Sequence, residues 1–155
     1  MQWRDLLQTA RDLLRASGGK PRQSNLHRAT STTYYAMFHA LAACAADLLI
    51  GGSNSARHPD AWRQVYRGID HRSARDACSP KKVGHLPQAI QDFANVFAAL
   101  QEKRHSADYD PTYRSTKSAV AVDINQAEVV IKGFQAAPAR DRRAFVAIVM
   151  FKTRG

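Results

Sequence analysis

The chain has 155 residues, of which 45% are hydrophobic, and its formal net charge at pH 7 is +10. This length and apolar content support one folded domain with a buried core and exclude a disordered chain. No apolar run is long enough to cross a bilayer, and residues 1–8 lack the apolar core of a signal peptide, so we expect a cytoplasmic protein with no membrane partner. The two cysteines, Cys44 and Cys78, have no metal-ligand spacing. The sequence therefore predicts no metal site and no cofactor.

The positive charge lies in three blocks. Residues 1–30 carry six Lys and Arg against two Asp, residues 57–85 carry seven against three, and residues 138–155 carry five against one. The segments 31–56 and 86–137 are close to neutral. Because phosphate attraction follows the local density of Lys and Arg, this distribution favours a polyanion such as RNA as a partner. An arginine-rich protein whose solvent-facing surfaces simply carry these charges would show the same distribution.

Two helices are predicted in the first third of the chain. The apolar positions of the first are Trp3, Leu6, Ala10 and Leu13. Ser17-Gly18-Gly19 and Pro21 end this helix. Ser24 is expected to cap a second, long helix that runs to Ile50 and ends at Gly51-Gly52. Its inner positions are Leu26, Thr30, Thr33, Met37, Ala40 or Leu41, Cys44 and Leu48. Its many alanines let neighbouring helices approach closely, which predicts that it is the central helix of a bundle.

In the middle of the chain, the sequence pattern predicts one short helix and a loop. Asp60 is expected to cap a third helix. The apolar residues of this helix are Trp62, Val65, Tyr66 and Ile69. Residues 71–85, HRSARDACSPKKVGH, have no helical periodicity and are expected to form a basic loop. The candidate phosphate-facing residues of this region are Arg63, Arg67, Arg72, Lys81 and Lys82.

The most regular patterns predict a fourth helix over about 86–108 and a fifth over about 116–136. The fourth carries Leu86, Ile90, Phe93, Phe97 and Leu100. The fifth carries Val120, Ile124, Ala127, Ile131 and Phe134. Such spacing produces a narrow apolar seam that suits nearly antiparallel packing. The pattern of residues 138–155 predicts a sixth helix or a docking tail. Self-association is a further role open to this segment. The sequence thus predicts an all-α, up-and-down bundle of five to six helices, with the bundle domain over residues 1–137 and this C-terminal segment over residues 138–155.

Arg104 stands where the fourth helix should place its next core residue. An arginine keeps its proton, so burying its head requires acceptors around it. Asp108 lies one turn further on the same face. A second polar stripe runs along the second helix and consists of Arg28, Thr32, Tyr35 and His39, with Ser31 beside it. We therefore expect a polar cluster between the two helices, in which Arg104 meets Asp108 and one of Ser31, Tyr35 or His39.

Two interpretations of this cluster remain open. In the first it is a structural tether that fixes the register of the two helices. In the second it is a ligand pocket, in which Arg104, Tyr109 and His39 face a phosphate or a base. His39 would then serve as an acid or base, and Arg104 as an electrophilic clamp. The spacing of the residues alone favours the tether.

Two stretches resemble HEPN-domain proteins. Residues 29–49, ATSTTYYAMFHALAACAADLL, are similar to the small-residue second helix of that family, with its Tyr-Tyr-Ala-x-Phe-His core. Residues 100–111, LQEKRHSADYDP, are similar to a later Arg-x-x-Ala-Asp-Tyr-Asp signature. The resemblance covers about residues 3–136. It implies an all-α bundle, usually a homodimer, that binds or acts on RNA or nucleotides. It also implies a nucleotidyltransferase partner in a toxin–antitoxin or defence system, and Tyr109 lies where such a partner modifies a tyrosine.

The ribonuclease branch of the family uses an arginine followed four to six residues later by a histidine. After Arg104 these positions hold Asp108, Tyr109 and Asp110, and the adjacent His105 projects about a hundred degrees away on the helix. We therefore expect a HEPN-like domain that binds RNA or a nucleotide, or partners a nucleotidyltransferase, and not a conventional HEPN ribonuclease. The alternatives are a helical dimerisation module without a ligand and an atypical metal-independent ribonuclease that uses Arg104 and His39.

Overall fold

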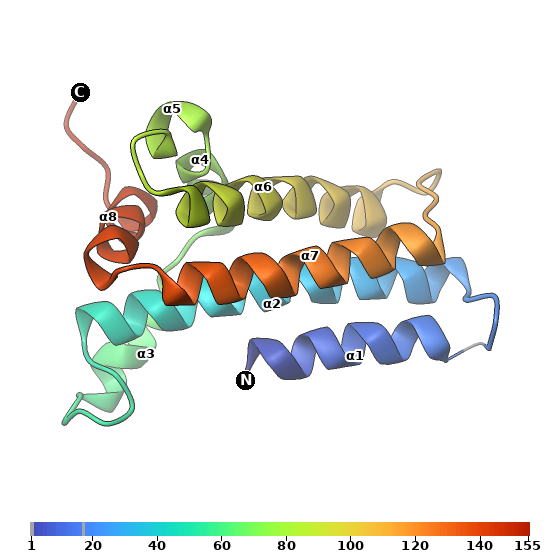
Figure 1. The fold of residues 1–155 in the computed structure, drawn as a ribbon, viewed down its shortest axis with the longest axis horizontal. Helices are drawn as coiled ribbons and strands as arrows, with labels where there is room; N and C mark the ends of the chain where they lie inside the picture. The colour runs from blue at the N-terminus through green and yellow to red at the C-terminus, as the bar shows by residue number, and fades with distance from the viewer. Residues whose placement is uncertain (1, 17) are drawn as a thin grey trace.

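The computed structural model describes residues 2–16 and 18–155, which form eight α-helices and no β-strand (Figure 1). The predicted all-α fold is therefore confirmed. The helices are α1 (Trp3–Arg15), α2 (Gln23–Leu49), α3 (Pro59–Arg67), α4 (His71–Ala77), α5 (Pro80–Val83), α6 (Gln88–Tyr109), α7 (Lys117–Ala136) and α8 (Ala139–Met150). None of them combines the length and the hydropathy that crossing a bilayer requires, within the described residues.

The four long helices α1, α2, α6 and α7 lie side by side along the long axis of the molecule (Figure 1). Helices α1 and α2 form one antiparallel pair, and α6 and α7 form another. Helix α2 contacts α1, α3, α6, α7 and α8, which confirms its predicted central position. The short helices α3, α4, α5 and α8 gather at the end of the bundle where α2 ends and α6 begins.

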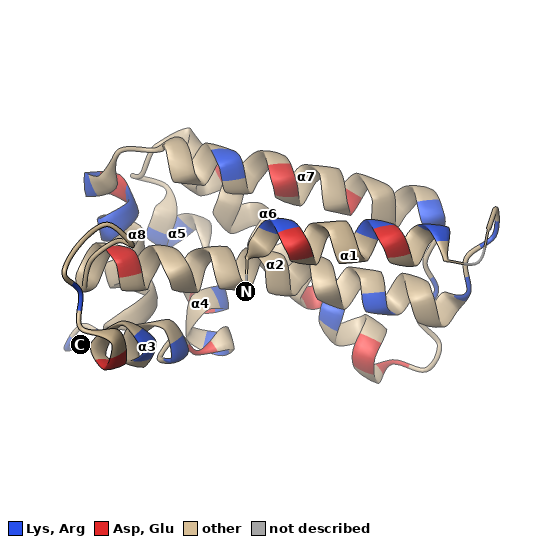
Figure 2. Cartoon of the chain, turned by 90° about the horizontal axis from the view of Figure 1, so that it is seen from below, with Lys and Arg blue, Asp and Glu red and all other residues tan. Residues whose placement is uncertain are grey.

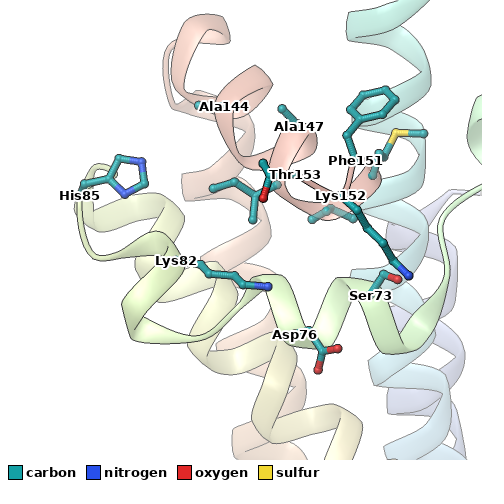
Figure 3. Close-up of a pocket in the computed structure, with 12 residues that line it drawn as sticks. Ser73, Asp76, Lys82, His85, Ala144, Ala147, Phe151, Lys152 and Thr153 are labelled. Atoms are coloured by element: carbon teal, nitrogen blue, oxygen red, sulfur yellow. The ribbon is translucent and has the colours of Figure 1, made fainter. Parts of the chain in front are cut away.

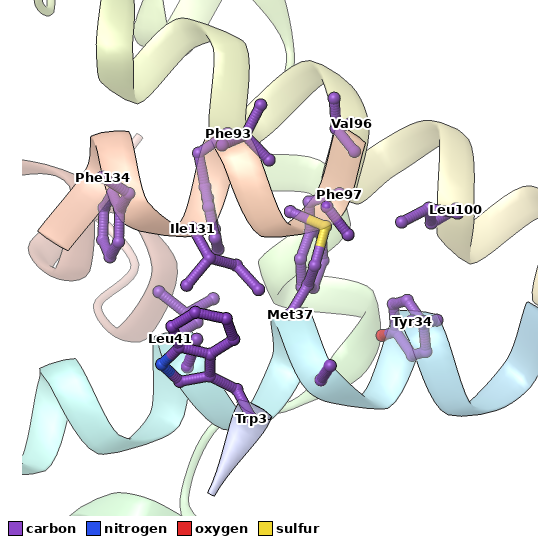
Figure 4. Packing of buried hydrophobic residues seen from close by; sticks show 14 of the residues in the cluster. Trp3, Tyr34, Met37, Leu41, Phe93, Val96, Phe97, Leu100, Ile131 and Phe134 are labelled. Carbon is purple, nitrogen blue, oxygen red and sulfur yellow. The ribbon is translucent and has the colours of Figure 1, made fainter. Parts of the chain in front are cut away.

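The core forms where the apolar seams of the long helices meet. All ten seam residues predicted for the fourth and fifth helices are buried. Phe93 stacks on Phe134 with ring centroids 4.4 Å apart. Met37 and Leu41 of α2 belong to the same core cluster (Figure 4). Phe145 of α8 meets Phe134 edge-on at 6.0 Å, so the C-terminal helix is part of the same core.

The buried face of α1 is rotated slightly about the helix axis from the predicted face. Trp3 and Ala10 are buried as expected, but Leu7 and Leu14 are buried with them, whereas Leu6 and Leu13 are only partly covered. Both sets of residues have helical spacing and share two positions. The sequence pattern alone could not separate the two registers, and packing of α1 against α2 and α7 selects one of them.

Two predicted helix caps are wrong. Helix α2 begins at Gln23, so Ser24 lies inside the helix and does not cap it. His58 caps α3 by accepting from the Ala61 amide at 3.4 Å, and Asp60 lies in the first turn. The predicted end of α2 is correct: Gly51 has φ +139°, a conformation that L side chains rarely adopt. Ser17, part of the predicted end of α1, lies outside the described residues.

The predicted basic loop over residues 71–85 is wrong, because it contains α4 and α5. Asp70 caps α4 by accepting from the Ser73 amide at 2.8 Å, and Pro80 opens α5 at a position that favours proline. Buried Ala74, Ala77, Cys78 and Val83 hold these short helices against the bundle. Helices of seven and four residues are too short to show an apolar period.

Candidate functional site

Arg104 lies on α6, on the side that α2 covers. Its side chain is 15% exposed. The guanidinium carbon stands 5.2 Å from the centroid of the Tyr34 ring and 5.8 Å from that of Tyr35. Aromatic faces attract a cation electrostatically and replace part of its hydration. The two tyrosines therefore explain how an arginine can occupy the position after the last apolar seam residue of α6.

Asp108 and Ser31 complete the cluster. Asp108 Oδ2 lies 3.5 Å from Arg104 Nη1, one helical turn away. Ser31 Oγ of α2 donates to Asp108 Oδ1 at 2.6 Å. The structure thus brings together Ser31, Tyr35, Arg104 and Asp108, which confirms the expected polar cluster between α2 and α6. We call these four residues with Tyr34 the Arg104 cluster.

The Arg104 guanidinium has spare hydrogen-bonding capacity. It carries five N–H donors, and its ion pair with Asp108 spans 3.5 Å, longer than a good hydrogen bond. Its Nε is buried and has no partner among residues 2–16 and 18–155. In these contacts Tyr34 and Tyr35 present their ring faces to the guanidinium, and neither provides an oxygen that accepts a hydrogen bond from it. The guanidinium is therefore held in place by rings while its donors remain largely unused.

His71 of α4 lies next to this cluster and is not among the predicted site residues. Its Nδ1 is 2.6 Å from the Tyr34 hydroxyl, and its ring stacks on Phe38 at 3.9 Å. Burial, followed by the nearby Arg104 charge, lowers the pKa of His71, and burial raises the pKa of Tyr34. Both groups are uncharged at neutral pH, so they add no net charge beside Arg104.

His39 contacts α3 and has no direct contact with Arg104 in the described part of the chain. Its Nδ1 shares a hydrogen bond with the Tyr66 hydroxyl, and the two rings stack at 5.7 Å. Burial lowers its pKa. Helices α2 and α6 run in opposite directions, so each step from Ser31 towards His39 leads away from Asp108. Of the three partners expected for Arg104, Tyr35 contacts it directly, Ser31 reaches it through Asp108, and His39 lies further along α2.

The remaining predicted residues lie on the surface. Arg28 is exposed on α2, and Tyr109 is 68% exposed at the end of α6, where its ring lies 4.9 Å from that of His105. The five candidate phosphate-facing residues are all exposed, on α3, α4 and α5. Figure 2 shows that basic residues also occupy α8 at this end of the molecule and α1 and α7 further along. Arg63 pairs with Asp60 on its own helix.

Arg22 and His27 form a pair with the ribonuclease spacing and are not among the predicted site residues. Arg22 is exposed immediately before α2. The His27 ring lies 5.4 Å from that of Tyr113, and its Nε2 is buried without a partner among the described residues. His27 stands one turn before Ser31 on the same face of α2.

The described part of the chain contains no preformed metal-binding site, because no three His, Cys, Asp or Glu side chains lie close enough together to hold an ion. No protein-family model matches the sequence, and neither a curated protein nor a solved structure matches it at a significant level.

Proposed function

We propose that this chain is a HEPN-like helical domain that binds RNA or a nucleotide through a phosphate contact at Arg104. One observation carries the proposal: the Arg104 guanidinium is fixed between two tyrosine rings while its buried Nε has no partner and its ion pair is long. A planar guanidinium binds a phosphate through two parallel hydrogen bonds. A phosphate at Arg104 would provide acceptors for the N–H donors that the long ion pair with Asp108 leaves unused.

Two neighbours of Arg104 suit a nucleotide ligand. Tyr35 is partly exposed, so its ring can stack on a base. Asp108 is held by Ser31 and is 34% exposed at its side chain, so an entering phosphate competes with a carboxylate that water already screens. The net charge of +10 adds long-range attraction for a polyanion, and this attraction falls with salt.

The partner enzyme in this proposal is a nucleotidyltransferase, in a toxin–antitoxin or defence system. The support is the resemblance together with the position of Tyr109, whose side chain is 68% exposed and whose hydroxyl a second protein can reach. Co-expression with a nucleotidyltransferase encoded next to this gene, followed by mass spectrometry, should find a nucleotidyl group on Tyr109. A Tyr109→Phe variant should remain unmodified.

The homodimer in this proposal has an apolar surface available on α7. Val122 and Val129 are 62% and 68% exposed and stand seven residues apart, so they lie on one side of the helix. Gly133 lies one turn after Val129 and leaves open space where a side chain would stand. Sedimentation of the wild type and of a Val122→Lys/Val129→Lys variant should show a dimer and a monomer, respectively.

A metal-independent ribonuclease is the second candidate function. It is favoured by the imidazole of His71, which contacts Tyr34 of the Arg104 cluster, and by that of His27, one turn before Ser31 on α2, whereas His39 contacts Tyr66 of α3. Purified protein in EDTA would then cut single-stranded RNA, and His71→Ala or His27→Ala would stop cutting while the fold survives. Intact RNA after prolonged incubation would eliminate this candidate.

Fluorescence anisotropy with a labelled single-stranded RNA tests the phosphate contact. Arg104→Gln should weaken binding by about tenfold, the loss expected for a hydrogen bond to a charged group. Arg15→Gln is the matched control, because it removes the same charge from an exposed position on α1. Equal loss in both variants would show that only the overall charge matters and would refute a specific site at Arg104.

A further inference from the structure

A groove of about 830 Å³ lies between α8 and the pair α4 and α5 (Figure 3). We call it the α8 groove. Helix α4 separates it from the Arg104 cluster, because His71 at the start of α4 faces α2, while Ser73 and Asp76 of the same helix line the groove. The groove is therefore distinct from the proposed phosphate site.

The two walls of the α8 groove differ in character. Helix α8 and the residue after it supply an apolar wall that includes Ala147, Ile148 and Met150, and Phe151 stands 61% exposed at its rim. The opposite wall, from α4, α5 and the turn after α5, is polar. An exposed phenyl ring at the edge of a two-sided groove offers apolar contact area that the protein itself does not bury.

The charged groups of the groove form no ion pair with the residues that the structure describes. Lys82 from α5 and Lys152 from the C-terminal segment both extend towards α4 (Figure 3). Neither ammonium group forms an ion pair with a described residue, and neither does the Asp76 carboxylate. The lining therefore presents two ammonium groups against a single carboxylate, beside an apolar wall.

We propose that the α8 groove binds an organic anion with an apolar body, such as a medium-chain carboxylate. The apolar chain would lie against Ala147, Ile148 and Phe151, and the carboxylate would meet Lys82 and Lys152. The volume is in the range of small-molecule sites, which combine an apolar lining with a few polar groups that fix the orientation. A nucleic acid fits less well, because the apolar wall would face its charged backbone.

Isothermal titration calorimetry with octanoate and with 1-octanol tests this proposal on the full chain. Octanoate should bind and octanol should bind more weakly, because only octanoate carries the charge. Lys82→Gln and Lys152→Gln should each weaken octanoate binding by about tenfold, the effect of losing one hydrogen bond to a charged group. Ala147→Trp should abolish binding, because the indole ring would occupy the groove.

The control variant is Lys132→Gln, which removes an exposed lysine from α7 and should leave the affinity for octanoate unchanged. Melting curves should show that the Ala147→Trp variant is folded. If this variant does not fold, the two lysine variants still test the proposal. No heat of binding with octanoate would overturn the proposal. Equal affinity for octanoate and octanol, or equal octanoate affinity in the wild type and in both groove lysine variants, would also overturn it.

Discussion

Replacing Arg104 with alanine tests whether the Arg104 cluster stabilises the fold as the contacts indicate. The change removes two cation–π contacts from a side chain that is 15% exposed, each about 1 kcal/mol at partly desolvated sites. It also removes a partly exposed ion pair with Asp108, which contributes at most about 1 kcal/mol. We expect a total loss of roughly 2–3 kcal/mol, or a melting temperature lower by about 5–10 °C for a chain of this size.

Circular dichroism at 222 nm during urea unfolding measures this loss directly, because the fold is almost entirely helical. Arg104→Met separates the charge from the packing: it should lose less than alanine, because its unbranched chain still covers Tyr34 and Tyr35. Arg15→Ala, on the exposed side of α1, is the reference for removing a positive charge alone. An Arg104→Ala stability within about 0.5 kcal/mol of the wild type would refute the reasoning, because surface substitutions have effects of that size.

Three further outcomes follow from buried titratable groups. Burial lowers the pKa of His39 and His71 below the usual 6.5, so the unfolded chain takes up protons first as the pH falls. The free energy of unfolding of the wild type should therefore decrease below about pH 6.5. A variant with glutamine at both positions should lose less stability over the same pH range, and equal pH profiles for the two proteins would contradict this. Burial raises the pKa of Cys78 to about 12, so a thiol reagent should modify it only after urea is added, and rapid native labelling would be evidence against its burial. Asp123, whose side chain is 10% exposed, accepts a hydrogen bond from Lys103 of α6 at 2.8 Å. Asp123→Ala should lower the free energy of unfolding in urea by about 1 kcal/mol, whereas Asp60→Ala, at an exposed ion pair, should have almost no effect.

The long helices were predictable because each repeats an apolar pattern over several turns. Leu86 to Leu100 and Val120 to Phe134 allow only one buried face, and both seams are buried as expected. In α1 the leucines come in adjacent pairs, so two faces were equally apolar and packing had to choose. Residues 71–85 contain helices too short for a period, although Asp70 before Ser73 and the Ser79-Pro80 pair are local signals of helix starts.

The candidate site was predictable where its partners share a helix or follow from helix spacing. Arg104 and Asp108 stand one turn apart, and Ser31 and Tyr35 follow from the polar stripe of α2. His71 could not be found in this way, because α4 reaches Tyr34 only through tertiary packing. The same limit applies to the hydrogen bond of His39, because Tyr66 comes from α3 and no periodicity relates the two helices.

The Arg104 side chain itself provides the most direct test of the phosphate contact. Its Nε–H group can be followed by ¹H–¹⁵N NMR in a uniformly labelled protein and assigned with Arg104→Lys, while a short single-stranded RNA is added. Binding should move this resonance progressively, because the phosphate would become a new acceptor for the guanidinium, and the Nε–H resonance of Arg15 should remain in place. An Arg104 resonance that does not move while the RNA demonstrably binds would contradict the account.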